Sequence, residues 1–270
     1  MGLRLQTVAA RQGLSWVREG LRGFLRWPLA YSLLFVMFMV AVSLVSLLPP
    51  LLGVPLVLMA SPLLGLGFTL AAHDAERGQA PHPRAFLAAW RGQPRLVQRH
   101  LLLLCMAFAV SAALVMAAGS GLGAERFFEV MDTVSRGQTS PDEAERLLSQ
   151  EGLAGPVLAL MALLSLLSLL FWHAPALVVW GGQGPGQAVF SSALALWRTR
   201  GAFFLYGLGW AGVVCGVGLL AGVLLPLLGQ VMGLLMMPLA TALAAAFYVS
   251  LYPCYRDTFG APDGGAPPHA

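Results

Sequence analysis

Six apolar segments, each long enough to cross a lipid bilayer, constrain the fold of this chain more than any other feature. They span residues 29–48, 51–72, 101–118, 155–180, 203–224 and 227–252. A helix of about 20 apolar residues crosses the hydrocarbon core, and within lipid a helix satisfies its own backbone hydrogen bonds. Only 10% of the residues are charged, against roughly 25% in soluble domains. The sequence therefore predicts an all-α, polytopic membrane bundle of six transmembrane helices.

The crossings are expected to form three pseudo-repeated units, each with an interfacial amphipathic helix followed by two crossings. The stretch Pro50-Leu-Leu-Gly53 recurs as Pro226-Leu-Leu-Gly229. Internal repeats are a recurrent way to build multi-pass bundles. The units cover about residues 10–78, 83–181 and 187–257 of a single transmembrane domain, 1–259. The tail 260–270 is rich in Gly, Pro and Ala and is expected to be disordered.

The second crossing of every unit contains a proline. These residues are Pro62, Pro175 and Pro238. A proline lacks the amide hydrogen and its ring clashes with the preceding turn, so each is expected to kink its helix. Such kinks serve as gating hinges in some membrane proteins and are passive features of others, and both interpretations stay open here.

A short amphipathic segment precedes the first, third and fifth crossings. In the first, Val17, Leu21 and Phe24 share one face at helical spacing, and Arg18 and Arg22 share the other. Aromatic and arginine side chains of this kind anchor helices at the headgroup level, and the same surface could dock a lipid headgroup or a protein partner. The candidate anchoring or docking residues are Trp16, Arg22, Arg26, Trp27, Phe86, Trp90, Arg91, Phe190, Trp197 and Arg198.

The distribution of basic residues indicates the topology, and all sixteen of them are arginines. Most lie before the first crossing, between the second and third, around residue 198 and after the last crossing, whereas the segment between the third and fourth crossings is net acidic. The positive-inside rule then places both termini in the cytoplasm of a bacterial cell. The basic face is expected to meet anionic lipid headgroups, and nucleic acid is not an expected partner.

The segment 119–154 is expected to form a short helical hairpin on the external face. Phe127, Met131 and Val134 repeat at helical spacing. Further on, Ser140 is followed by a proline and, three residues after Ser140, by Glu143, which is the pattern of an N-cap and a capping box. Its acidic residues are expected to form a solvated face.

His173 is the one ionisable residue that the sequence places deep within a crossing, two residues before Pro175. An ionisable group inside the bilayer is a functional-site hypothesis by default. The alternative is a neutral histidine that is hydrogen-bonded within the packing, and the sequence favours it because no charged relay partner lies at that depth.

The fifth crossing carries two pairs of glycines at a spacing of four residues. They are Gly212 with Gly216, and Gly218 with Gly222. Small residues at this spacing let helix backbones approach closely. A contact within the bundle is the favoured interpretation, and a contact in a homo-oligomer is the alternative.

No group of residues suited to catalysis, a metal or a cofactor can be assembled. The absence of lysine excludes a P-loop nucleotide site and a Schiff-base enzyme. The three cysteines lack paired spacing, and His73, Asp74, His82 and His100 match no zinc arrangement. We therefore expect neither an enzyme nor a bound metal or cofactor.

Several motifs resemble a known family. They are Pro50-Leu-Leu-Gly53, Ala75-Glu-Arg-Gly78 and Phe171-x-x-Ala-Pro-Ala-Leu-Val178. The chain resembles, over about residues 10–258, the proteobacterial multi-pass inner-membrane proteins known only by a Burkholderia locus tag. It is more distantly similar to the membrane domain attached to some glycerophosphodiesterases, without their soluble catalytic domain. The resemblance implies an inner-membrane location and no reaction, ligand or site residue.

Two functions follow as hypotheses. The first is a noncatalytic structural or accessory component of an inner-membrane complex, because the crossings lack a polar pathway and the interfacial helices offer docking surfaces. The alternative is a transporter or channel for a small or lipidic solute, which the kinked repeats favour and which requires a cavity or groove between the units.

Overall fold

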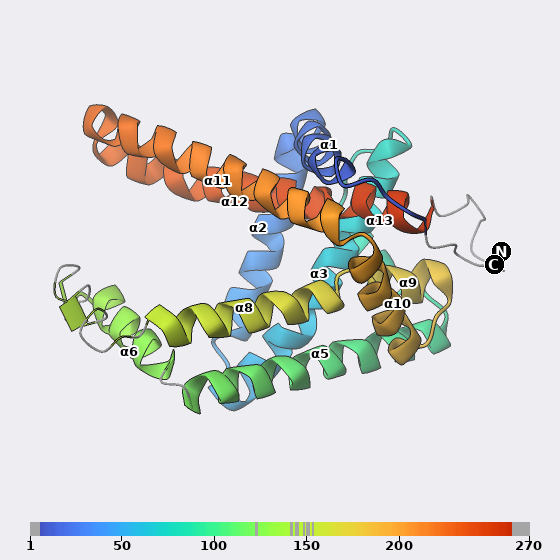
Figure 1. Ribbon diagram of the computed structural model, residues 1–270, viewed down its shortest axis with the longest axis horizontal. Coiled ribbons are helices and arrows are strands. Elements are labelled where there is room, and N and C mark those ends of the chain that lie inside the picture. Colours follow the sequence, from blue (N-terminus) through green and yellow to red (C-terminus); the bar gives the residue numbers. More distant parts are fainter. Residues whose placement is uncertain are drawn as a thin grey trace.

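The computed structural model describes residues 6–121, 124–140, 143, 146, 147, 149, 152 and 154–260 (Figure 1). The regular structure of these residues is helical, as predicted. In chain order the helices are α1 (Gln12–Arg26), α2 (Pro28–Val45), α3 (Pro50–Glu76), α4 (Arg84–Trp90), α5 (Arg95–Gly121), α6 (Ala124–Ser135), α8 (Ala154–Leu170), α9 (Ala174–Gly181), α10 (Pro185–Arg198), α11 (Arg200–Leu228), α12 (Gln230–Val249) and α13 (Leu251–Phe259).

Six helical stretches are long and apolar enough to cross a membrane, which confirms the six predicted crossings. They are Pro28–Val45, Leu51–Glu76, Arg95–Gly121, Ala154–Gly181, Arg200–Leu224 and Leu234–Phe259. The fourth is made of α8 and α9, and the sixth of α12 and α13. Each crossing matches a predicted apolar segment because bilayer thickness sets the length of such a segment.

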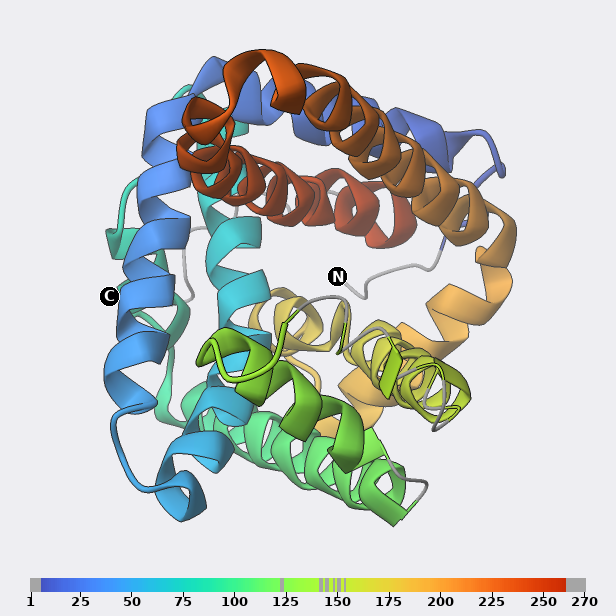
Figure 2. The ribbon, with the colours of Figure 1, turned by 90° about the vertical axis from the view of Figure 1, so that its left-hand side faces the viewer.

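The crossings form three helix pairs that are splayed rather than parallel. The α11–α12 pair and the α5–α8 pair extend as two arms in the same direction from a shared end, where α9, α10 and α13 lie (Figure 1). The α2–α3 pair runs from one arm to the other (Figures 1 and 2). The arms are therefore held together by the shared end and by the α2–α3 pair.

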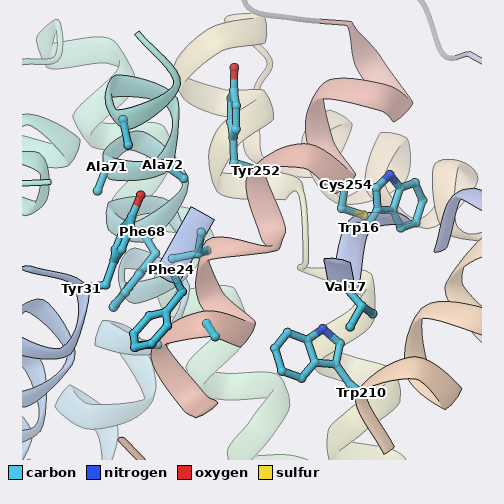
Figure 3. Packing of buried hydrophobic residues seen from close by; sticks show 14 of the residues in the cluster. Trp16, Val17, Phe24, Tyr31, Phe68, Ala71, Ala72, Trp210, Tyr252 and Cys254 are labelled. Carbon is cyan, nitrogen blue, oxygen red and sulfur yellow. The ribbon is translucent and has the colours of Figure 1, made fainter. Parts of the chain in front are cut away.

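Two clusters of buried apolar side chains fill the interior. The first joins α1 and α2 to α11 and α12 and includes Trp16 and Trp210 (Figure 3). The second joins α5 to α8, α9 and α10 and includes Leu104 and Leu177. Helices α3 and α13 contribute side chains to both clusters, so these two helices connect the arms through continuous packing.

The order of elements agrees with the predicted units, because a short helix (α1, α4 or α10) precedes each helix pair. Whether the units are repeated copies in three dimensions stays a prediction. The three prolines do not behave alike. Pro62 and Pro238 lie inside the helices α3 and α12, whereas helical geometry is interrupted at residues 171–173 and resumes in α9, where Pro175 occupies the first turn.

Helix α1 is held tightly against the bundle, and its predicted location in the headgroup plane stays a prediction. It packs on α11, α12 and α13, and its buried face is formed by Gly13, Trp16, Val17, Gly20 and Phe24. A Cβ atom at Gly13 would collide with the Ala202 carbonyl, and one at Gly20 with Ser250. The two glycines thus permit close contact between α1 and the bundle.

The glycine pairs of the fifth crossing also depart from the favoured interpretation. At Gly212, Gly216, Gly218 and Gly222, a Cβ atom would have no described atom of another element within 4 Å. The expected close contact with another helix of the same chain is therefore not found at these positions. Helix α11 instead approaches α1 through Gly209, where a Cβ atom would lie 3.0 Å from Val17.

The external segment folds in part as predicted. Helix α6 contains Phe127, Met131 and Val134, and the backbone N–H of Glu143 donates to Ser140 Oγ over 3.2 Å, which is the hydrogen bond of an N-cap. Most of the predicted second helix lies outside the described residues, as does the tail after residue 260.

Candidate functional site

Arg256 is the centre of a charged cluster at the shared end of the molecule. Its Nη1 lies 2.6 Å from Glu76 Oε1 on α3, and its Nη2 lies 2.8 Å from Glu19 Oε2 on α1. Its Nε lies 3.0 Å from Oδ1 of the neighbouring Asp257. We call these four residues the Arg256 network. One guanidinium therefore satisfies three carboxylates and connects α1, α3 and α13.

Neutral side chains extend the Arg256 network. Gln12 Nε2 and Trp16 Nε1, both on α1, donate to Asp257 Oδ2 over 2.7 and 3.0 Å. Tyr252 on α13 donates to Glu76 Oε2 over 2.8 Å. The Arg256 side chain is 26% exposed, so its ion pairs are screened less than those of a fully exposed arginine. The network fixes the position of α1 relative to the last crossing.

A pocket of about 260 Å³ lies beside the Arg256 network, and we call it the basic pocket. Arg22 and Arg26 of α1 line it, with Trp27 at the corner between α1 and α2. Side chains of α2, α3, α12 and α13 complete its wall, among them Tyr31 and Arg256. Three arginines and two glutamates thus face one small volume.

A larger cavity of about 810 Å³ lies between the arms, and we call it the inter-arm cavity. It is lined by residues of α3, α5, α8, α9, α10, α11, α12 and α13. Aromatic side chains dominate its wall, namely Phe108, Phe171, Trp172, Phe203, Phe204, Tyr206, Trp210, Phe247 and Tyr248. It shares no lining residue with the basic pocket.

Few polar groups reach the inter-arm cavity. The Ser168 hydroxyl donates to the Leu164 carbonyl over 2.8 Å, and the hydroxyls of Tyr206 and Ser250 lie 2.7 Å apart. The buried indole N–H groups of Trp172 and Trp210 lie near the Cys254 thiol and the Tyr206 hydroxyl, respectively, without a hydrogen bond of normal geometry to the described residues. An apolar wall with a few isolated polar groups is typical of a site for an apolar molecule.

His173 is buried at the break between α8 and α9, and the structure supplies the partner that the sequence did not reveal. Its Nε2 lies 3.7 Å from Cys254 Sγ on α13, and its backbone N–H donates to Ser192 Oγ on α10 over 3.2 Å. The ring packs edge-on against Phe203, Tyr255 and Phe259. These contacts agree with a histidine bonded within the packing, and neither His173 nor Cys254 lines either pocket.

The predicted anchoring residues fall into three groups. Phe190 and Trp197 on α10 are 67% and 70% exposed, and the Trp197 ring lies 5.2 Å from the Arg200 guanidinium. Trp27, Phe86 and Trp90 are half-buried, whereas Arg22, Arg26, Arg91 and Arg198 are exposed. Trp16 is fully buried, so its predicted role as an exposed anchor is wrong.

The sequence also missed how the charged residues combine. Glu19, Glu76 and Asp257 follow or precede apolar segments in three distant parts of the chain, and nothing in their spacing connects them. These three acidic residues share one feature in the sequence, which is that each lies within or beside an apolar helix on the arginine-rich side of the predicted topology. The aromatic wall of the inter-arm cavity gave no signal distinct from ordinary core packing.

Six apolar crossings, an aromatic cavity between them and a charged cluster at one end define a multi-pass membrane protein. No family model matches this chain, and no solved structure matches it. The chain is 33% identical to the probable inner membrane protein BTH_II0599 of Burkholderia thailandensis over 267 residues, which cover 98% of this chain and 97% of that relative. The chain belongs to the same family of multi-pass inner-membrane proteins, which confirms the resemblance seen in the sequence.

Proposed function

We propose that this protein is a noncatalytic inner-membrane protein that binds a lipidic solute in the inter-arm cavity, as a transporter or carrier of that solute. The observation that carries the proposal is the cavity of about 810 Å³ between the arms, with its wall of aromatic and aliphatic side chains. Sites for small molecules in proteins have volumes of roughly 300–1,000 Å³ and mostly apolar walls. The volume and the chemistry therefore suit part of a lipid or another apolar molecule.

The isolated polar groups support an amphiphilic rather than a purely apolar solute. Ser61, Ser165, Ser168 and Arg200 line the cavity. A solute that carries a hydroxyl or carbonyl oxygen could hydrogen-bond to these side chains, whereas a hydrocarbon could not.

The test is native purification of the full chain with its bound lipids, followed by mass spectrometry. Gly207 lines the cavity, and a Cβ atom there would have no described atom within 4 Å. We expect Gly207→Phe to fill the cavity and to remove the bound solute. The neighbouring Leu208 is exposed and does not line the cavity, so Leu208→Phe places the same ring outside it and serves as the control. Equal solute retention in the two variants would contradict the proposal.

The second candidate function is a structural or accessory component of a membrane complex. Exposed Phe190 and Trp197 on α10 favour it, because aromatic residues are enriched at protein interfaces. The expected result of Trp197→Ala is weaker association with any membrane-protein partner that copurifies with the wild-type chain. An unchanged set of copurifying proteins would argue against this function.

For the topology, we propose that both termini face the cytoplasm and that the basic end contacts anionic headgroups. The Gln6 N–H donates to the Thr258 carbonyl over 2.9 Å, so the first and last described residues lie on the same side of the molecule. An even number of crossings places the two termini on the same side of the membrane. The arginines of the α1, α4 and α10 regions supply the positive charge that cytoplasmic loops carry.

A further inference from the structure

The basic pocket contains two arginines that form no ion pair with a described carboxylate. Arg22 and Arg26 make no ion pair with the described residues, and they lie one turn apart on α1. Residues four positions apart on a helix are neighbours on its surface. Their guanidinium groups can therefore converge on one anion in the pocket that both of them line.

The acidic residues of the basic pocket are hydrogen-bonded and ion-paired, but the one charge of Arg256 does not neutralise all of them. Glu19 and Glu76 line the pocket, but each is already ion-paired with Arg256. Their second carboxylate oxygens accept hydrogen bonds from Ser15 and Tyr252. An anion in this pocket therefore has to be held by direct hydrogen bonds from the guanidinium groups of Arg22 and Arg26, and not by an excess of positive charge.

A third donor lies in the same pocket. The indole N–H of Trp27 is buried and has no hydrogen-bond acceptor among the described residues, and Trp27 lines the pocket at the corner between α1 and α2. An acceptor oxygen brought by a ligand would satisfy this group if a shift of the Trp27 ring brought its N–H to the pocket surface. The two guanidinium groups already form a donor set that matches a phosphate, because arginine binds phosphate oxygens in a bidentate manner.

We propose that the basic pocket binds the phosphate of an anionic phospholipid headgroup. The pocket lies where α1 turns into the first membrane crossing, and its remaining wall includes Tyr31, Ala72 and Val249. An apolar wall at the start of a crossing suits the glycerol and the upper acyl chains of a lipid, whereas a soluble phosphate would leave it uncovered. Basic pockets between membrane helices are known to bind lipid headgroups. This site is separate from the inter-arm cavity and does not depend on the function proposed for it.

The experiment titrates the purified full chain with phosphatidylglycerol and measures binding by native mass spectrometry. We expect Arg22→Gln with Arg26→Gln to weaken binding by about tenfold or more, the effect of about 1.4 kcal/mol. The matched control is Arg11→Gln with Arg18→Gln, which removes two exposed arginines near or on the same helix that do not line the pocket. The control should bind phosphatidylglycerol as the wild type does.

A second variant allows the proposal to be tested even if the double substitution perturbs folding. Trp27→Phe keeps an aromatic ring and removes the indole N–H, and we expect it to weaken binding about threefold, less than the loss of both cations. Phosphatidylcholine and glycerol 3-phosphate are titrated alongside as a lipid without net charge and a soluble phosphate.

Three results would overturn the proposal. If both double variants lost the same amount of phosphatidylglycerol binding, the lipid would be attracted by the whole surface of α1 and not by the pocket. Binding unchanged in both Arg22→Gln with Arg26→Gln and Trp27→Phe would mean that the pocket is not used. Glycerol 3-phosphate binding as tightly as phosphatidylglycerol would identify a soluble phosphate, and not a lipid, as the ligand.

Discussion

Among single residues, Arg256 links three helices through its side chain alone. Its three carboxylate partners come from α1, α3 and α13, and two of them also accept hydrogen bonds from Trp16, Gln12 or Tyr252. Removing one partner from a buried ion pair leaves the other charge uncompensated. The stability of the shared end therefore depends on this guanidinium.

Arg256→Met is expected to lower the free energy of unfolding by about 2 kcal/mol. Breaking a fully buried pair costs about 3–5 kcal/mol, and the partial exposure of Arg256 reduces that effect. Thermal unfolding in detergent, compared with Arg198→Met at an exposed arginine of α10, measures the difference. Identical unfolding temperatures for the two variants would show that the network contributes little to stability.

Individual residues also show where sequence patterns mislead. Trp16 stands among arginines and apolar residues in the first short helix, which is the pattern of an interfacial anchor. It is instead buried, and its indole N–H donates a hydrogen bond to Asp257, which lies 241 positions away in the sequence. The partner of His173 is likewise a distant residue, Cys254, and the spacing of the cysteines in the sequence did not indicate this contact.

Among the helices, the position of α1 depends on glycine rather than on its apolar side chains alone. Gly13 and Gly20 lie against backbone or Cβ atoms of α11 and of the α12–α13 junction. Leu14 and Leu25, which are also apolar residues of α1, are exposed on the protein surface. A helix buries the face that its neighbours can approach most closely. On α1 this is the face that carries the glycines.

Gly13→Ala is expected to displace α1 from α11 and to destabilise the protein by about 2 kcal/mol, the usual cost of overpacking a close contact. Hydrogen exchange of the α1 amides should become faster. Gly186→Ala on α10 is the control, because a Cβ atom there would have no described atom within 4 Å. Unchanged exchange in α1 would mean that the helix tolerates the added methyl group by a small shift.

For the molecule as a whole, the predicted topology can be checked directly. Alkaline phosphatase is active only outside the cytoplasm, so a fusion after residue 260 should be inactive and a fusion at Gly137, in the turn that follows α6, should be active. The expectation rests on the positive-inside rule and on the contact between Gln6 and Thr258. The opposite pattern of activity would invert the proposed orientation and place the basic pocket on the periplasmic side.

The splayed arrangement of the arms is also a property of the complete fold. The cavity exists because the α2–α3 pair runs from one arm to the other instead of packing parallel to both (Figure 2). Three parallel hairpins in close contact would leave no such volume. The hypothesis of a site for a lipidic solute therefore depends on helix packing, which the apolar segments do not specify.

The class of protein, the number and approximate positions of the crossings and the short helices before each pair could all be predicted from the sequence. These are local properties, since the thickness of the bilayer sets the length of an apolar segment and helical periodicity shows in neighbouring residues. The burial of Trp16, the joining of three helices by Arg256 and the two pockets became visible only in the folded molecule. Each of these depends on contacts between residues far apart in the chain, and lipid-facing and core-facing positions of an apolar crossing are equally apolar. A pattern of hydrophobicity along the chain therefore cannot tell which face of a crossing meets a neighbour.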